Sequence, residues 1–82
     1  MDLYTLASAA ERIGCTPNRL KVWIDKGYVP EMRIQMGKVR ARVVDEESIR
    51  QIKRVLEATE QEGLTIQGAF SRYFNKEEVN ED

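Results

Sequence analysis

The chain has 82 residues with a formal net charge of −1; 41% of the residues are hydrophobic and 33% are charged, and there is one cysteine and no histidine. This length allows one domain, the apolar content excludes a disordered chain, and the missing histidines exclude histidine-based catalysis and histidine metal sites. One cysteine excludes an internal disulfide, and the longest strongly apolar stretch, Val22 to Ile24, is far too short to span a membrane, so we expect a cytoplasmic protein.

The first third of the chain predicts two short helices joined by a tight turn. Thr5 can cap the first helix and Gly14 can end it. Thr16 then caps a second helix over about residues 17–26, in which Pro17 occupies the first helical position. The apolar residues that repeat at helical spacing are Leu6, Ala9, Ala10 and Ile13 in the first helix and Leu20, Trp23 and Ile24 in the second. Two short helices with this connection predict a helix-turn-helix.

A change to alternating periodicity predicts a β-hairpin over about residues 32–44, with Gly37 and Lys38 in its turn. On the second strand, apolar and basic residues alternate in the order Val39, Arg40, Ala41, Arg42 and Val43. We therefore expect a hairpin whose basic side faces outward. Because two strands alone are only marginally stable, the hairpin must lean on the helices, and beside a helix-turn-helix we interpret it as a wing.

Two further helices are expected after the hairpin. Asp45 can cap a third helix, which carries acidic residues in its first turn and ends at Gly63. The spacing of Glu46 and Arg50 predicts an ion pair between them. Thr65 can cap a fourth helix, whose apolar residues at helical spacing are Ile66, Ala69, Phe70, Tyr73 and Phe74.

The expected fold is mostly α with a small β-hairpin: a winged helix-turn-helix in the order helix, helix, wing, helix, helix. We expect one domain over residues 1–75. Residues 76–82 are mainly acidic and polar, and we expect them to form a disordered tail.

The small net charge conceals a basic segment. Residues 1–44 carry eight Lys or Arg against four Asp or Glu, whereas residues 45–82 carry five against ten. Within residues 16–44 only Asp25 and Glu31 are acidic. Such a segment indicates a surface for a polyanion, although charged runs are often only solvated faces.

The outward face of the second helix suits the major groove of duplex DNA. Asparagine can pair with adenine, arginine with guanine or phosphate, and an exposed valine can meet a thymine methyl group. The wing offers flexible cations for the flanking phosphates, although the same cations would also protect an edge strand from aggregation. The candidate DNA-binding residues are Thr16, Asn18, Arg19, Lys21, Val22, Lys26, Arg33, Lys38, Arg40 and Arg42.

Nothing in the sequence indicates catalysis, a metal site or a cofactor. The acidic run Asp45 to Glu47 is better explained by a helix N-terminus, because successive helical residues point apart. Cys15 lacks a histidine or second cysteine as a partner, so we expect a packed thiol. The aromatic residues occur at helical spacing, which favours a core over a base-stacking role. We therefore expect a protein that is not an enzyme.

Several segments resemble the winged-helix DNA-binding domain of the MerR superfamily of bacterial transcription regulators. They are Tyr4 to Leu6 with Ala10, Ile13 and Gly14; Thr16 to Trp23; Lys26 to Pro30; Gly37 to Glu47; and Glu62 to Ile66 with Ala69. Together they cover about residues 3–74. The chain departs from the family pattern at Lys21, where arginine is usual, at Val43, where a second arginine is frequent, and at Val44, where tyrosine is common.

The resemblance implies a sequence-specific module for double-stranded DNA, associated with the nucleoid, with its second helix in the major groove and its wing on the flanking backbone. It also implies dimeric binding to palindromes through a long helix after the fourth one, and hence a homodimer or an effector domain outside these 82 residues. Two alternatives remain. One is an architectural DNA-binding protein similar to phage excisionases or small terminase subunits, and the other is a protein-interaction module for an antirepressor-type partner.

Overall fold

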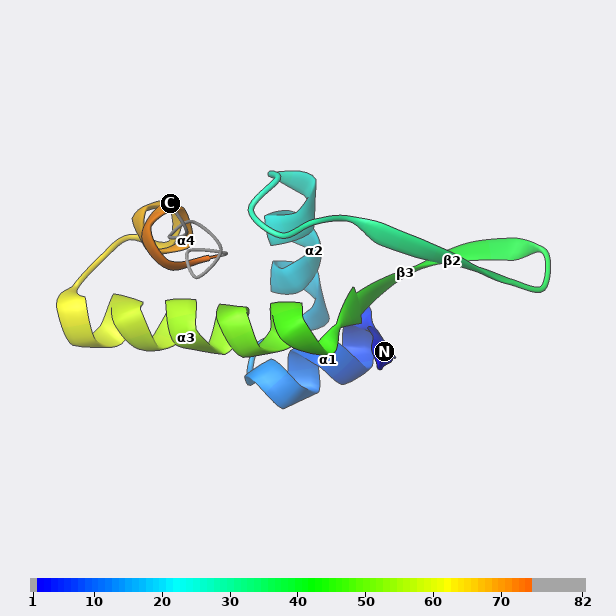
Figure 1. The fold of residues 1–82 in the computed structure, drawn as a ribbon, viewed down its shortest axis with the longest axis horizontal. Coiled ribbons are helices and arrows are strands. Elements are labelled where there is room, and N and C mark those ends of the chain that lie inside the picture. Colours follow the sequence, from blue (N-terminus) through cyan, green and yellow to red (C-terminus); the bar gives the residue numbers. More distant parts are fainter. Residues whose placement is uncertain (1, 75–82) are drawn as a thin grey trace, which may run out of the picture.

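Residues 2–74 are described by the computed structural model, and they contain three strands and four helices (Figure 1). In chain order these are β1 (Leu3–Thr5), α1 (Leu6–Ile13), α2 (Pro17–Asp25), β2 (Met32–Met36), β3 (Val39–Asp45), α3 (Glu46–Glu62) and α4 (Ile66–Tyr73). The predicted winged helix-turn-helix, mostly α with a β-hairpin, is confirmed. The tail expected over residues 76–82 lies outside the described residues.

Side-chain oxygens fix the helix starts at the predicted positions. In all four helices the residue before the first turn accepts a hydrogen bond from the backbone N–H three residues on; these residues are Thr5, Thr16, Asp45 and Thr65. Gly14, at φ 95°, ends α1 in the left-handed conformation that a residue with a side chain rarely adopts. The second helix is one residue shorter than predicted, because Lys26 forms its C-cap and the chain reverses at Gly27, at φ 85°.

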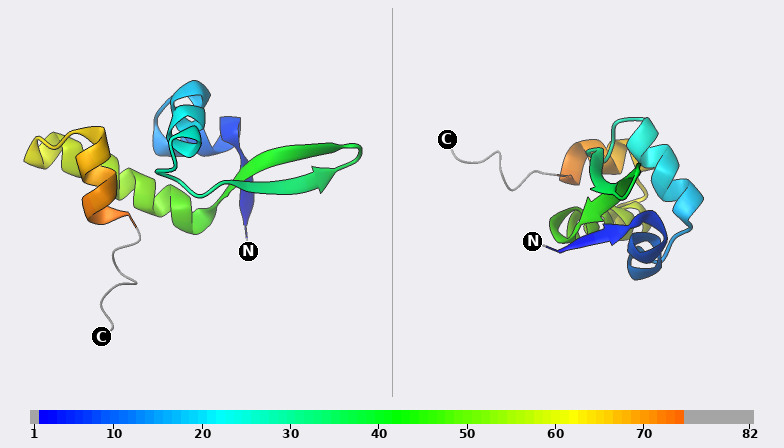
Figure 2. Two further views of the ribbon diagram at one scale, coloured as in Figure 1. Left: turned by 90° about the horizontal axis from the view of Figure 1, so that it is seen from above. Right: turned by 90° about the vertical axis from the view of Figure 1, so that its right-hand side faces the viewer.

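The sheet contains one strand that the sequence pattern did not indicate. β1 pairs antiparallel with β3, so the strand order is β1-β3-β2. Three residues are too few to show an alternating pattern, and Thr5 was interpreted only as a helix cap. The extra strand makes the inner end of β3 the centre of a three-stranded sheet, whereas the outer hairpin has two strands and projects from the helical body (Figure 2).

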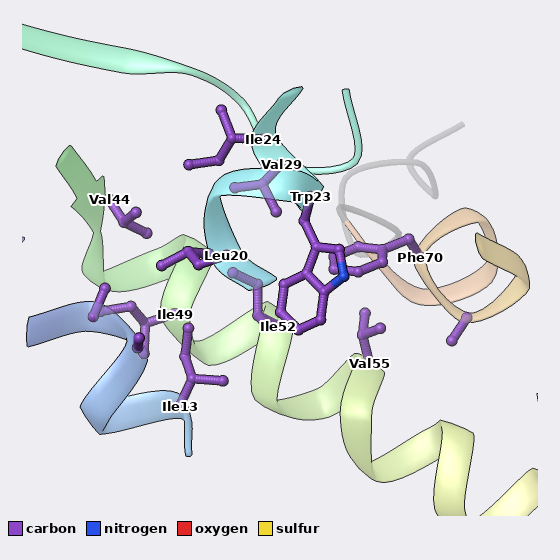
Figure 3. Close-up of a cluster of buried hydrophobic side chains, with 13 residues drawn as sticks. Ile13, Leu20, Trp23, Ile24, Val29, Val44, Ile49, Ile52, Val55 and Phe70 are labelled. Atoms are coloured by element: carbon purple, nitrogen blue, oxygen red, sulfur yellow. The ribbon is translucent and has the colours of Figure 1, made fainter. Parts of the chain in front are cut away.

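All four helices contribute to the core, together with Val29 and with Val44 of β3 (Figure 3). Trp23 is 4% exposed, and its ring centroid lies 5.5 Å from that of Phe70 on α4. Leu20 is fully buried, and Ile52 and Val55 of α3 lie close to the indole. The predicted inward face of α2 is therefore confirmed.

The predicted ion pair between Glu46 and Arg50 is wrong. Glu46 instead accepts a hydrogen bond of 2.7 Å from the Tyr4 hydroxyl, and Arg50 pairs with Glu47. The tyrosine comes from β1, the unpredicted strand, so its position could not be inferred from helical spacing. This contact ties the first strand to the start of α3.

Candidate nucleic-acid interface

The outward face of α2 carries six of the ten candidate residues, counting its N-cap and C-cap. Thr16, Asn18, Arg19, Lys21, Val22 and Lys26 are all exposed. The Thr16 hydroxyl oxygen accepts a bond from the Arg19 N–H, so this residue has a structural role in starting the helix. Val22 is 40% exposed and makes an apolar spot on an otherwise polar helix face.

Arg19 lies at the edge of this face, and its guanidinium packs over the ring of Trp23. Its guanidinium carbon lies 5.2 Å from the centroid of the Trp23 ring. A cation over an indole face at this distance is attracted to the ring. The contact therefore holds Arg19 at the flank of the helix.

A chain of ion pairs connects α2 to the base of the wing. Lys21 Nζ lies 3.8 Å from Asp25 Oδ2, and Asp25 Oδ1 lies 3.0 Å from Arg42 Nη2 on β3. Arg42 Nε is also 3.4 Å from Glu31 Oε2, which is 2.6 Å from Arg33 Nη2. We call these five residues the wing-base network. It holds three cations and two carboxylates, so it remains positively charged by one unit.

The wing-base network engages three of the seven basic candidates with carboxylates: Lys21, Arg33 and Arg42. The Arg42 side chain is only 21% exposed, and together with Arg33 it is engaged by carboxylates. Lys26, Lys38 and Arg40 are exposed and make no ion pair within residues 2–74. Their charge is available to an external anion.

The strand register gives the wing two unlike faces. Arg33 lies opposite Arg42 and Gln35 opposite Arg40, which makes one face basic and polar. On the other face the opposed pairs are Met32 with Val43, Ile34 with Ala41, and Met36 with Val39. This apolar face is covered at the base, where Val43 is 2% exposed, and uncovered at the tip, where Val39 is 63% exposed.

Asp25 and Glu31 join α2 to the base of the wing, a role that the sequence analysis did not assign to either residue. Asp25 has the spacing of an ordinary surface residue on α2, and Glu31 lies in the connection to β2. One indication of this role was present in the sequence: they are the only two acidic residues within residues 16–44. Their shared partner Arg42 lies at least eleven positions away in the chain, so helical or strand spacing gives no indication of it.

Other ionisable groups do not form a second chemical site in the described part of the chain. Partial burial raises the pKa of the Cys15 thiol, which therefore stays protonated at neutral pH. Among residues 2–74 there is no group of three or more acidic or cysteine side chains that could hold a metal ion. No helix in this range combines the length and apolar character needed to cross a bilayer.

A known protein family matches most of the chain. The sequence model of the family described as "MerR HTH family regulatory protein" matches residues 4–70, which include α1, α2, the whole wing and α3. A search of curated protein sequences gave no significant match.

Proposed function

Because this chain belongs to the MerR family of helix-turn-helix regulatory proteins, which bind DNA, we propose that it reads duplex DNA with α2 in the major groove and the wing on the flanking backbone. The observation that carries this proposal is the ion pair between Asp25 and Arg42. It places the outward face of α2 and the basic face of the wing side by side, so that one duplex can contact both.

We assign the base-reading positions to Asn18 and Val22, which lie on the exposed face of α2. The asparagine amide can pair with adenine, and the valine can contact a thymine methyl group. The flanking cations Arg19, Lys21 and Lys26 would contact phosphates. They would fix the helix in its register without selecting a sequence.

The wing residues have two roles in this proposal. Lys38 and Arg40 supply phosphate contacts, since both are exposed and free of carboxylates within residues 2–74. Arg42, which the sequence analysis predicts to contact a phosphate, pairs with Asp25 and would hold the wing against α2, whereas Arg33 pairs with Glu31 at the base of the wing. The remaining unit of positive charge on the wing-base network still favours a nearby phosphate.

We propose a regulator that acts by binding, without catalysis, on DNA in the cytoplasm and nucleoid. A single module of this size buries a modest area on DNA and binds weakly, so function requires a second copy or a further domain that pairs two modules. The excisionase-like alternative uses the same DNA surface. It would be distinguished by clustered tandem sites in place of a palindrome.

The test is an amide chemical-shift titration of the chain with a short generic duplex at two salt concentrations. We expect shifts concentrated at residues 16–27 and 33–42, smaller at the higher salt, because phosphate binding releases counterions. Shifts confined to α3 and α4, or no shifts, would reject DNA binding by this surface and favour a protein partner.

A further inference from the structure

The outer part of the wing is a two-stranded ribbon with an open edge. β1 pairs with β3 only from Val43 to Asp45, and β2 is the last strand in the order β1-β3-β2. Within residues 2–74, therefore, no strand pairs with the outer edge of β2, and the ribbon projects away from the helical body (Figure 2). A two-stranded ribbon is only marginally stable in water, and further strands stabilise it. The outer edge of β2 is thus a place where another strand can be added.

The strand register identifies the peptide groups at this edge. Met36 and Val39 flank the two-residue turn, so their peptide groups face each other across the ribbon. Successive residues of an antiparallel ladder point their peptide groups to opposite sides, so those of Arg33 and Gln35 point outward from β2. Each of these two residues therefore offers an N–H and a carbonyl oxygen to an added strand.

The side chains of β2 give its edge little protection against pairing. Natural edge strands are commonly protected by charged residues or by proline. Arg33 is the one charged residue of β2, and its Nη2 lies 2.6 Å from Glu31 Oε2, so its charge is already engaged. The residues on the other face of the strand are the apolar Met32, Ile34 and Met36, of which Met36 is 51% exposed.

We propose that the outer edge of β2 pairs antiparallel with the same edge of a second copy, centred on Ile34, so that two wings form one four-stranded sheet. In this register the outward peptide groups of Arg33 meet those of Gln35 of the second copy and exchange hydrogen bonds with them. Ile34 lies opposite Ile34 of the second copy, and Met32 lies opposite Met36. The apolar faces of the two wings therefore become continuous.

Self-complementarity of β2 favours a second copy as the occupant of this edge. A register centred on Arg33 would set two guanidinium groups directly opposite each other, which is unfavourable. The register centred on Ile34 sets each arginine opposite a neutral amide. It also brings Glu31 next to the turn of the second copy, which contains Lys38, so that opposite charges lie close together.

Pairing within the plane of the sheet leaves the proposed DNA surface uncovered. The two-fold axis of an antiparallel pair is perpendicular to the sheet, so both wings present the face that carries Arg40 on the same side. The two helical bodies lie at opposite ends of the paired wings. The pairing itself does not require DNA, whereas its use on an inverted repeat rests on the proposed function.

The first experiment is disulfide cross-linking of the free protein in a Cys15→Ser background. The test variant is Ile34→Cys, because directly opposed residues in such a pair have Cα atoms about 4.5 Å apart, a distance that a disulfide spans. The matched control is Val39→Cys. Val39 is more exposed, at 63%, but it lies on the outer strand of the proposed sheet, at least about 14 Å from its counterpart. Random collisions would cross-link the control at least as well as the test variant.

The second experiment removes one edge N–H by Gln35→Pro. This N–H points away from β3, so the ladder within the wing is retained. The matched control is Gln35→Thr, which keeps the N–H but also loses the 2.9 Å hydrogen bond from Gln35 Nε2 to the Gly37 carbonyl oxygen. Sedimentation equilibrium measures the dimer dissociation constant, and circular dichroism checks the fold of each variant. We expect Gln35→Pro to raise this constant at least about tenfold, because the dimer loses two hydrogen bonds, and Gln35→Thr to change it little.

Preferential cross-linking of Ile34→Cys, together with weaker dimerisation of Gln35→Pro, would support the inference. A chain that stays monomeric at its highest soluble concentration, or preferential cross-linking of Val39→Cys, would overturn it. So would a dimer that Gln35→Pro leaves unchanged, because its interface would then lie elsewhere. Binding of a duplex in any of these cases would leave the proposed function standing. Cross-linking at Ile34→Cys without binding of any duplex would reject the proposed function and retain the pairing.

Discussion

Asp25 Oδ1 on α2 lies 3.0 Å from Arg42 Nη2 on β3, and this ion pair joins the two elements of the proposed DNA surface. Arg42 also contacts Glu31, so its guanidinium is held from two sides and is largely covered. The Asp25 carboxylate remains about half exposed, so water screens the attraction between the two charges. The pair is a direct side-chain contact between α2 and the wing.

Replacing Asp25 by asparagine should strengthen DNA binding. The amide oxygen of asparagine can still accept a bond from Arg42, so the wing keeps its position, while one negative charge leaves the proposed DNA surface. We expect about three- to tenfold tighter binding of a generic duplex at low salt, which fluorescence anisotropy would measure. Glu60→Gln is the matched control, since it changes the net charge equally on α3. Equal effects of the two variants would mean that net charge alone controls binding.

Replacing Arg19 and Lys21 together by alanine should weaken DNA binding while leaving the domain folded. Both side chains are exposed, and removing two cations that we propose bind phosphates should lower the slope of log affinity against log salt by about 1.8. The control is Lys53→Ala, an exposed cation on α3. Anisotropy titrations at several salt concentrations give the slopes. Normal binding by the double variant would show that α2 does not contact DNA.

The parts of the fold that were predictable are those encoded by neighbouring residues. Thr16 followed by Pro17 starts a helix through local geometry alone, and Gly14 ends one because only glycine adopts its conformation readily. β1 was not predictable, because its stability comes from pairing with β3, about forty residues later in the chain. The partner of Glu46 was not predictable for the same reason. Helical spacing predicted an ion pair with Arg50, but Glu46 accepts a hydrogen bond from the hydroxyl of Tyr4 on β1.

The candidate site was likewise predictable only where neighbouring residues determine it. The exposed face of α2 could be predicted from the inward positions of Leu20 and Trp23, because helical periodicity relates the two faces. The ion pair between Asp25 and Arg42 could not be predicted, because it depends on where the wing meets the helix. Charge counting found the basic segment but could not separate the cations that hold the wing from those that remain available.

Trp23→Ala should destabilise the domain strongly. The indole is 4% exposed and packs against Phe70, and truncating a buried aromatic side chain costs about 3–5 kcal/mol. Urea unfolding followed by circular dichroism would measure the destabilisation. The neighbouring variant Val22→Ala is the control, because a change at an exposed helix position should alter the free energy of unfolding by less than about 0.5 kcal/mol. Similar destabilisation in both variants would contradict the orientation of α2.

Alkaline pH should destabilise the chain through two tyrosines. Hydrogen bonds from the hydroxyls to Glu46 and Glu62 raise the pKa of Tyr4 and of Tyr73 above the ordinary value of 10.0. Because the folded state holds these protons more tightly, their contribution to stability is present below pH 10 and is lost as the pH rises through the folded-state values. Urea unfolding between about pH 9 and pH 11 should therefore show a falling free energy of unfolding. The variant with Tyr4→Phe and Tyr73→Phe should show a shallower fall over the same range, and an equally steep fall would assign the effect to other groups.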